Sequence, residues 1–411
     1  MSALPACRLC GATLAQTLVD LGAMPLANRL LTREELSRPE PRYPLHARVC
    51  GACLLVQVAD VASSQDIFGD YTYFSSYSQS WVAHARAFAT MARDRFKLGP
   101  ESHVIEIASN DGYLLRNFVE MKIPCLGIEP AANVAKVAVE AGVPTEVRFF
   151  GTETARDLAA RGLTADLIVG NNVLAHVPDP NDFIRGLALA VKPDGVLSLE
   201  FPHLQNLLRE VQFDTIYHEH FSYLSLHVVM RAFRKHGLEV FDVERLPTHG
   251  GSLRVFAAPA AAGRPRDAHV DDVLHGEITT GMESLSAYRN FSGKVKAVRD
   301  ALRAFLLDAK SKGSKVAAYG AAAKGATLLN YGNVTTDLVV LVADRSPHKQ
   351  HRFMPGCHLP ILPPEAVIDQ MPDYLLILPW NLRKEIMGEM DIIREWGGRF
   401  VTAIPKLEIV P

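Results

Sequence analysis

Short apolar runs alternate with amphipathic stretches through the middle of the chain. Residues 79–96 carry apolar positions at the spacing of one helix face, which predicts a long amphipathic helix. Short apolar runs bounded by turn residues predict buried strands. Strands that alternate with helices at this spacing predict a parallel, doubly wound sheet. The predicted strands lie at 103–108, 124–128, 166–170 and 195–201, followed by an antiparallel pair at 239–243 and 252–257.

The C-terminal part of the chain starts the same α/β pattern again. A helix is predicted over 295–311, and 315–320 is predicted as a strand that runs into a turn rich in glycine and alanine. Further strands are predicted at 338–343 and 374–378, whereas 258–267 is a loop by composition. This restart predicts a second α/β unit, separate from the first.

The N-terminal part contains four of the six cysteines and only short strand signals, such as 43–49. The cysteines form two pairs, Cys7-x-x-Cys10 and Cys50-x-x-Cys53. Each pair is typical of a tight turn that aims two thiolates at one point, and two such turns supply the four sulfurs of a tetrahedral zinc site. Four thiolates leave no open coordination position, so the predicted zinc is structural. The 39-residue gap between the pairs is expected to hold a small sheet.

Length and charge limit the function classes. With 411 residues and 48% apolar composition, the chain can fold as three domains, predicted at 1–74, 75–285 and 286–411. The net charge of −2 gives no electrostatic case for a nucleic-acid partner. No apolar run is long enough for a membrane span, and the N-terminus lacks the features of a signal peptide. We therefore expect a cytoplasmic protein, and this size is compatible with a monomer.

The segment after the strand at 103–108 has the features of a cofactor turn. It reads Glu106-x-Ala108-x-Asn110-Asp-Gly112 and leads into a predicted helix, whose N-terminal amides would face a ligand. Glu129 ends the next strand, where a carboxylate can accept both hydroxyls of a ribose. A dinucleotide fingerprint needs G-x-G-x-x-G, but this turn has one glycine. The pattern therefore favours S-adenosylmethionine (SAM) over NAD.

Other predicted cofactor contacts follow the later strands. Phe150 could contact the adenine, and Asn171 and Asn172, at the end of the strand at 166–170, would face the amino-acid end of the cofactor. His176 would lie near the methyl group, with a helix-capping or core histidine as the alternative interpretation.

A run of titratable side chains, Tyr217-His218-Glu219-His220-Phe-Ser-Tyr223, follows the strand at 195–201. Such a run beside a cofactor cleft is where general acid/base residues are expected. In a turn, Tyr217 and His220 would be neighbours at i, i+3. The run is not H-E-x-x-H, which excludes the zinc-protease motif. A second metal held by His218, Glu219 and His220, or a purely structural cluster, remain alternatives.

The C-terminal unit carries cations at its strand ends. Lys324 lies in Gly-Ala-Ala-Ala-Lys-Gly after the strand at 315–320, and Lys349 and Arg352 follow the next strand. Small residues and a cation at a helix N-terminus suit a diphosphate. An ordinary turn with a solvated basic loop is one alternative, and an NAD site, which no G-x-G-x-x-G supports, is the other.

These motifs together resemble the sugar C-methyltransferases of antibiotic deoxysugar biosynthesis, the family of the tetronitrose, mycarose and noviose methyltransferases. The resemblance covers the whole chain. It rests on the paired cysteines, the turn at 106–112, Asn-Asn-Val-Leu-Ala-His at 171–176, the run at 217–223 and the turn at 319–325. It implies an N-terminal zinc-binding domain, a central class I Rossmann-like SAM methyltransferase domain and a C-terminal Rossmann-like domain for the nucleotide sugar.

The resemblance also implies a reaction: transfer of the SAM methyl group to a carbon beside the keto group of a dTDP-linked 4-keto-6-deoxyhexose, expected at C3. Removal of the α-proton gives an enolate that attacks the methyl group. His220 is the candidate base, because an imidazole titrates near working pH. Tyr217 and His176 are candidate donors to the keto oxygen.

Three further roles follow from the same resemblance. Glu219 would orient His220 or bind a sugar substituent, Tyr71 would close over the site, and Tyr223 would contact the sugar. O- or N-methylation of a nucleotide sugar is the alternative reaction. An RNA methyltransferase is disfavoured by the charge, and a non-catalytic scaffold by the titratable run.

Overall fold

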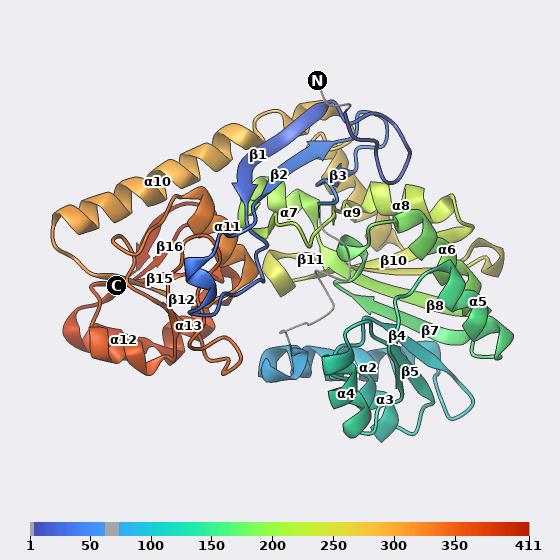
Figure 1. Cartoon of the computed structure of the whole chain (residues 1–411). Coiled ribbons are helices and arrows are strands. Elements are labelled where there is room, and N and C mark those ends of the chain that lie inside the picture. The colour runs from blue at the N-terminus through green and yellow to red at the C-terminus, as the bar shows by residue number, and fades with distance from the viewer. Residues whose placement is uncertain (1–3, 62–73, 411) are drawn as a thin grey trace.

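The computed structural model describes residues 4–61 and 74–410 (Figure 1). Three sheets form these regions: a small N-terminal sheet, a seven-stranded central sheet and a six-stranded C-terminal sheet. Both larger sheets carry helices, as the α/β prediction requires. Tyr71, a predicted site residue, lies outside the described residues. Among the residues that are described, no helix is long and apolar enough to cross a membrane.

The N-terminal sheet has the strand order β1-β2-β3-β9 and is antiparallel throughout. The predicted strand at 43–49 is confirmed as β2, and the small sheet expected between the cysteine pairs is present. The outer strand β9 comes from the titratable run, because Val56 pairs with Tyr223 and Gln57 with Ser222. The candidate catalytic segment is therefore joined to the N-terminal sheet. The strands are β1 (Gln16–Met24), β2 (Tyr43–Val49), β3 (Val56–Gln57) and β9 (Ser222–Tyr223), with a 3-10 turn η1 (Glu35–Ser37).

The central sheet has the order β6-β5-β4-β7-β8-β11-β10. The first five strands in this order are parallel, and β11 is antiparallel to both β8 and β10. Its order reverses between β4 and β7, which creates a crevice at their carboxyl ends. Its strands are β4 (Val104–Ile107), β5 (Cys125–Ile128), β6 (Thr145–Glu146), β7 (Ala165–Asn171), β8 (Val191–Pro202), β10 (Leu238–Leu246) and β11 (Ser252–Pro259).

Helices and 3-10 turns connect these strands. The helix predicted at 79–96 is confirmed as α2 with the same bounds, and Ser78 caps it by accepting a hydrogen bond from Trp81 N. The helices are α2 (Gln79–Phe96), α3 (Leu115–Glu120), α4 (Ala132–Glu140), α5 (Thr152–Ala160), α6 (Pro180–Ala190), α7 (Leu204–Arg209), α8 (Leu226–Arg234) and α9 (Ala268–Thr279). The 3-10 turns are η2 (Ser75–Tyr77), η3 (Leu174–His176), η4 (Phe213–Thr215), η5 (Thr248–Gly250), η6 (Ala260–Ala262) and η7 (Leu285–Tyr288). The loop predicted at 258–267 begins too early, because its first two residues still belong to β11, and it contains η6.

Both faces of the central sheet are buried, which explains why its strands are continuous apolar runs. In β4, Val104 packs in one hydrophobic core with Phe88 of α2, whereas Ile105 packs in the core on the other face with Phe183 of α6. Burial of each such side chain contributes roughly 1.5–3 kcal/mol.

The C-terminal sheet has the order β14-β13-β12-β15-β16-β17, parallel except for β17. This is the doubly wound order 3-2-1-4-5-6, with its reversal between β12 and β15. The strand predicted at 338–343 is shorter than expected, since only its last two residues pair. The strands are β12 (Val316–Tyr319), β13 (Val342–Ala343), β14 (Ile361–Leu362), β15 (Tyr374–Ile377), β16 (Arg399–Thr402) and β17 (Glu408–Val410). The helices are α10 (Phe291–Ser311), α11 (Ala323–Tyr331), α12 (Glu365–Gln370) and α13 (Arg383–Glu389), with 3-10 turns η8 (Trp380–Leu382) and η9 (Asp391–Trp396).

One hydrophobic core joins the N-terminal and C-terminal parts. It contains Leu18 of β1, Leu306 of α10 and Leu328 of α11. Figure 1 shows α10 running from the N-terminal sheet to the C-terminal sheet. Because these parts share one core, the ends of the two large sheets are held in a fixed relation.

Candidate active site

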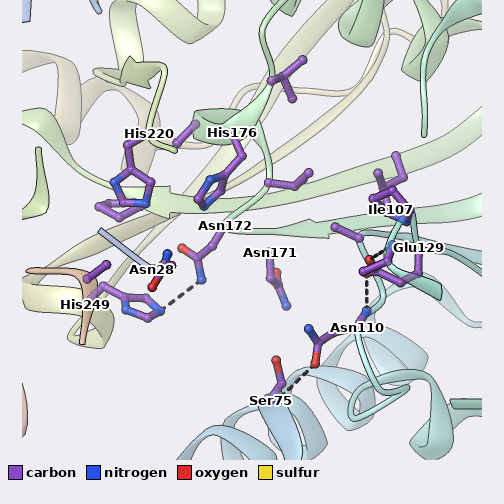
Figure 2. A pocket seen from close by; sticks show the side chains of 18 of the residues that line it. Asn28, Ser75, Ile107, Asn110, Glu129, Asn171, Asn172, His176, His220 and His249 are labelled. Carbon is purple, nitrogen blue, oxygen red and sulfur yellow. Dashed lines mark hydrogen bonds between the residues drawn. The ribbon is translucent and has the colours of Figure 1, made fainter. Parts of the chain in front are cut away.

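A cavity of about 370 Å³ lies where the three parts meet. This volume is within the range of cofactor and substrate sites. Figure 2 shows Glu129 and Asn110 on one side of the cavity, His176 and His220 on the other, and Asn171 and Asn172 between them. The predicted site residues that line it are Ala108, Asn110, Glu129, Phe150, Asn171, Asn172, His176, Tyr217, His220, Lys324 and Lys349.

The turn after β4 brings the backbone close to the cavity. Ala108 and Asn110 adopt left-handed conformations, with φ of 55° and 52°. Glu129 holds this turn, since its Oε2 accepts a hydrogen bond from Asn110 N (2.9 Å) and its Oε1 from Ala131 N (2.8 Å). Burial raises the pKa of Glu129, and these two N–H donors oppose the rise. The turn therefore presents a carboxylate to the cavity at a strand end.

Two predicted cofactor residues, Glu106 and Gly112, do not line this cavity. Glu106 is fully buried, and burial raises its pKa well above the ordinary value, with Asp111 adding to the rise. Gly112 lies against Val143, where an added Cβ would come within 3.0 Å of a methyl carbon. Both residues support the turn from behind because their side-chain positions face the protein interior.

Aromatic rings line the cofactor side of the cavity. Phe150 meets Phe183 edge-on, with ring centroids 5.5 Å apart. Trp81 stacks near Tyr113, with centroids 6.0 Å apart. These rings provide apolar walls on either side of the polar strand ends.

Tyr217 and His220 form a hydrogen-bonded pair in a turn. His220 N donates to Tyr217 O (3.0 Å), which agrees with the predicted i, i+3 relation. His220 Nδ1 lies 2.9 Å from Thr215 O, and a carbonyl oxygen can only accept. Nδ1 therefore carries the proton, and Nε2 of the neutral ring accepts the Tyr217 hydroxyl proton at 2.7 Å. Burial lowers the pKa of His220 well below its ordinary value, and nearby His176 lowers it further.

His176 lies beside this pair, with its ring centroid 4.6 Å from that of His220. Its Nδ1 donates to Glu219 O at 2.7 Å, and burial lowers its pKa to about 4. In a neutral ring that donates at Nδ1, the unprotonated Nε2 can accept but cannot donate. This corrects the prediction that His176 donates to a keto oxygen.

The other members of the run point away from the cavity. Glu219 Oε1 accepts from Asn28 N (3.2 Å), and His218 Nε2 bonds Tyr43 O (3.2 Å). Glu219 therefore does not orient His220; the Thr215 carbonyl does. Among the described residues, His218, Glu219 and His220 have separate partners and form no metal-binding group. Tyr223 is buried in β9 and does not line the cavity.

The C-terminal domain contributes two cations. Lys324 Nζ donates to Asn381 Oδ1 (2.7 Å) and lies 4.9 Å from the Trp380 ring centroid. Burial lowers the pKa of Lys324. Lys349 Nζ donates to Ala321 O (2.9 Å). The third predicted cation, Arg352, is exposed and lies outside the cavity lining, because its loop turns it to the surface.

Sequence comparisons identify relatives of all three parts. Residues 7–68 match the family described as "Putative zinc binding domain", 81–243 the family "Methyltransferase domain" and 247–405 the family "C-methyltransferase C-terminal domain". C-methyltransferase NovU of Streptomyces niveus is 36% identical over 98% of this chain and 96% of its own length. The chain belongs to this family of C-methyltransferases.

Other relatives match in part. The ubiquinone biosynthesis O-methyltransferase of Methylobacterium sp. (strain 4-46) is 31% identical, covering 28% of this chain and 48% of its own length. The solved structure of magnesium protoporphyrin IX methyltransferase (ChlM) from Synechocystis PCC 6803 with bound SAM covers 47% of this chain and 88% of its own, at 16% identity and a TM-score of 0.33.

The family is SAM-dependent, and the cavity of this C-methyltransferase fits SAM. The oxygens Asn171 Oδ1 and Asn172 Oδ1 are buried without a hydrogen-bond partner among the described residues. Buried polar atoms of this kind need a partner. SAM bound between Glu129 and the histidines can supply such a partner, because its ammonium group is a hydrogen-bond donor.

The predicted zinc site is also formed in this C-methyltransferase. Its two turns are alike: Gly11 N donates to Cys7 O (2.8 Å), and Leu54 N to Cys50 O (3.0 Å). Gly11 and Leu54 both have left-handed φ values, 79° and 64°. Each turn therefore folds its Cys-x-x-Cys pair back towards one point.

The sulfur positions fit one zinc ion. Cys7 Sγ lies 3.6 Å from Cys53 Sγ, and Cys10 Sγ 3.5 Å from Cys50 Sγ. All four lie within 4.8 Å of one another. Four sulfurs held at ~2.3 Å in a tetrahedron are separated by about 3.8 Å. The ion would serve as a structural link between the two turns.

Sequence reasoning did not single out Asn28, Trp81 or His249, which also line the cavity. His249 lies in the hairpin turn between β10 and β11. Because Ser252 pairs with Pro202 at the end of β8, this hairpin turn lies at the carboxyl edge of the sheet. Ligands bind at that edge of such sheets. The position of His249 between two predicted antiparallel strands could therefore have identified it as a site residue from the sequence. Asn28 and Trp81 gave no comparable signal.

Proposed function

We propose that this C-methyltransferase transfers the SAM methyl group to C3 of a dTDP-linked 4-keto-deoxysugar through an enolate. The observation that carries the proposal is the composition of one cavity. It holds the turn with Glu129, the Tyr217–His220 pair and the cations Lys324 and Lys349. This reaction needs three things in one cavity: a cofactor site, a base and a group that binds phosphate.

The cofactor side would hold SAM through six residues. Glu129 accepts the ribose hydroxyls, Phe150 covers the adenine, and the two orphan amide oxygens face the amino-acid end. Bound SAM supplies an electrophilic methyl group on sulfur. The remaining contacts come from the close backbone of the turn. The six residues are Ala108, Asn110, Glu129, Phe150, Asn171 and Asn172.

The Tyr217–His220 pair would remove the α-proton. Neutral His220 already accepts the hydroxyl proton of Tyr217 at Nε2. As that proton moves to His220, the phenolate oxygen of Tyr217 takes the proton from C3, so His220 is the final acceptor and the substrate becomes an enolate. General-base assistance of this kind contributes typically ~10²–10⁴-fold. The Thr215 carbonyl stabilises the imidazolium that forms, because it binds Nδ1–H.

Other predicted residues take supporting roles in this proposal. His176 lines the cavity beside the Tyr217–His220 pair but does not serve as a donor to the keto oxygen. Glu219 positions Asn28 at the cavity wall through its backbone N–H. Tyr223 supports the run from β9, and Tyr71 remains a proposed contact over the site. Arg352, which is exposed and outside the cavity lining, takes no role in this proposal.

The two lysines would hold the diphosphate. Lys324 is confined by Asn381 and Trp380, and Lys349 by Ala321 O, so both ammonium groups are oriented before substrate binds. Two fixed cations bind a diphosphate at a lower entropic cost than mobile ones.

The experiment is incubation with labelled SAM and a panel of dTDP-linked 4-keto-6-deoxyhexoses in deuterated water. We expect a new carbon-bound methyl group at C3 by NMR, and enzyme-dependent deuterium exchange at C3. Methylation on oxygen or nitrogen without exchange would overturn carbon methylation and support the alternative reaction.

A further inference from the structure

The hairpin between β10 and β11 holds a histidine that the proposed mechanism does not use. His249 has a left-handed φ of 51°. Two contacts fix its loop: Thr248 Oγ1 donates to the buried Glu200 at 2.7 Å, and Gly250 packs so closely on Trp380 that an added Cβ would lie 2.3 Å from the ring. The ring of His249 is therefore placed by neighbours on both sides.

The hydrogen bond of His249 decides which nitrogen carries the proton. Its Nε2 lies 3.1 Å from Asn172 Nδ2, and an amide nitrogen can only donate (Figure 2). Burial lowers the pKa of His249 to about 4, so the ring is neutral near pH 7. A neutral ring that accepts at Nε2 carries its proton at Nδ1. Among the described residues, no partner bonds this Nδ1.

The two predicted donors to the keto oxygen already donate their protons in other hydrogen bonds. His176 donates through Nδ1 to Glu219 O, and the hydroxyl proton of Tyr217 goes to His220. An enolate oxygen nevertheless needs a donor aimed at it as charge develops. His249 lines the same cavity and offers a neutral N–H.

We propose that His249 is a catalytic hydrogen-bond donor whose Nδ1–H binds the substrate keto oxygen and stabilises the enolate. This rests on the proposed function. No proton leaves His249: the C3 proton goes to Tyr217 as the hydroxyl proton of Tyr217 goes to His220, and the N–H of His249 stabilises the charge on the enolate oxygen. Asn172 acts as the positioning residue, because its amide sets the tautomer.

The first test needs no sugar. The zinc-loaded enzyme, labelled with ¹⁵N-histidine and saturated with S-adenosylhomocysteine, is studied by NMR at pH 7. His249 is assigned by the signal lost in His249→Leu. A neutral ring protonated at Nδ1 supports the proposal. A ring protonated at Nε2, or at both nitrogens, overturns it.

The second test uses turnover. We expect His249→Leu, which has no polar side-chain atom, to lower kcat and the rate of deuterium exchange at C3 together by about 10²–10³, the usual cost of one lost donor to an oxyanion. The exposed His275, outside the cavity, is the matched control, and His275→Leu should leave both rates unchanged. A melting temperature near that of the wild type shows that the variant is folded. Exchange and methylation within about threefold of the wild type would overturn the proposal.

The two tests separate two failures. If the wild-type enzyme methylates no dTDP-linked keto-sugar, the proposed function fails, and the NMR tautomer still decides whether His249 can act as a donor. If the wild type methylates C3 and His249→Leu does so equally well, only the role of His249 fails.

Discussion

The turn after β4 and the turn after β12 occupy equivalent places, each beside the reversal of its sheet. After β4, Asn110 N donates to Glu129 Oε2 (2.9 Å), and after β12, Ala321 N donates to Asp344 Oδ2 (2.7 Å). Each carboxylate ends the next strand of its sheet and also accepts the backbone N–H two residues further along, at 2.8 Å in both cases. Both turns line one cavity.

The two turns differ in charge. The β4 turn presents Glu129 and no cation, whereas the β12 turn leads directly into Lys324, and Lys349 Nζ lies 3.7 Å from Asp344. The same backbone arrangement therefore suits a cationic ligand on one side and an anionic ligand on the other. Under the proposed function, the fold would place the two ligands and a few side chains would select them.

The largest effect is expected where the two sides meet. His220→Asn should lower kcat by about 10²–10⁴, because no acceptor remains for the proton of Tyr217. SAM affinity by calorimetry should stay unchanged, since neither turn is altered. His275→Asn serves as the exposed control. A rate near that of the wild type would remove His220 as the base.

A smaller effect is expected on the acidic side. Glu129→Ala should raise the Kd of SAM by about 100-fold, because charge-assisted hydrogen bonds contribute roughly 1.5–3 kcal/mol. The KM of the sugar should change little. Calorimetry with SAM measures the effect, and Asp344→Ala is the matched variant in the other turn. Equal losses of SAM affinity in both variants would show that the two turns do not divide the ligands.

On the basic side, Lys324→Met should raise the Kd of dTDP about tenfold, because one of two cations facing the diphosphate is lost. SAM affinity should not change. Lys312→Met, at an exposed position, is the matched control. An unchanged Kd of dTDP would show that the diphosphate binds elsewhere. The proposal that the two turns bind different ligands would then fail.

The smallest effect concerns pH. Burial holds the pKa of His220 well below 6.5, so the ring stays neutral as pH falls through 6.5 and accepts a proton only at lower pH. We expect kcat/KM to change less than about twofold between pH 8 and pH 6.5. At pH values lower than 6.5, where His220 becomes protonated, kcat/KM should decrease. A pH profile checks this, with pre-incubation at each pH to exclude unfolding. Half-maximal activity at pH 6.5 or above would contradict a buried neutral base.

Local patterns predicted much of the fold. The helix at 79–96 and the strand at 43–49 have the predicted bounds, because periodicity and capping act within a few residues. The paired cysteines and the turn after β4 were also found locally, since short spacing aims their side chains. Strand boundaries were predicted less accurately where only a few residues pair with the neighbouring strand, as in the two-residue β13. The domain limits at 74 and 285 remain predictions.

The sequence by itself determined the fold class, the zinc cysteines and the residue types around the cavity. Only the tertiary structure decided which side chains face the cavity and which nitrogen of each histidine carries its proton. His176 is bonded to Glu219 and His249 to Asn172, partners 43 and 77 residues away. A tautomer depends on the atom that each ring nitrogen meets, and those atoms meet only after the sheets have packed.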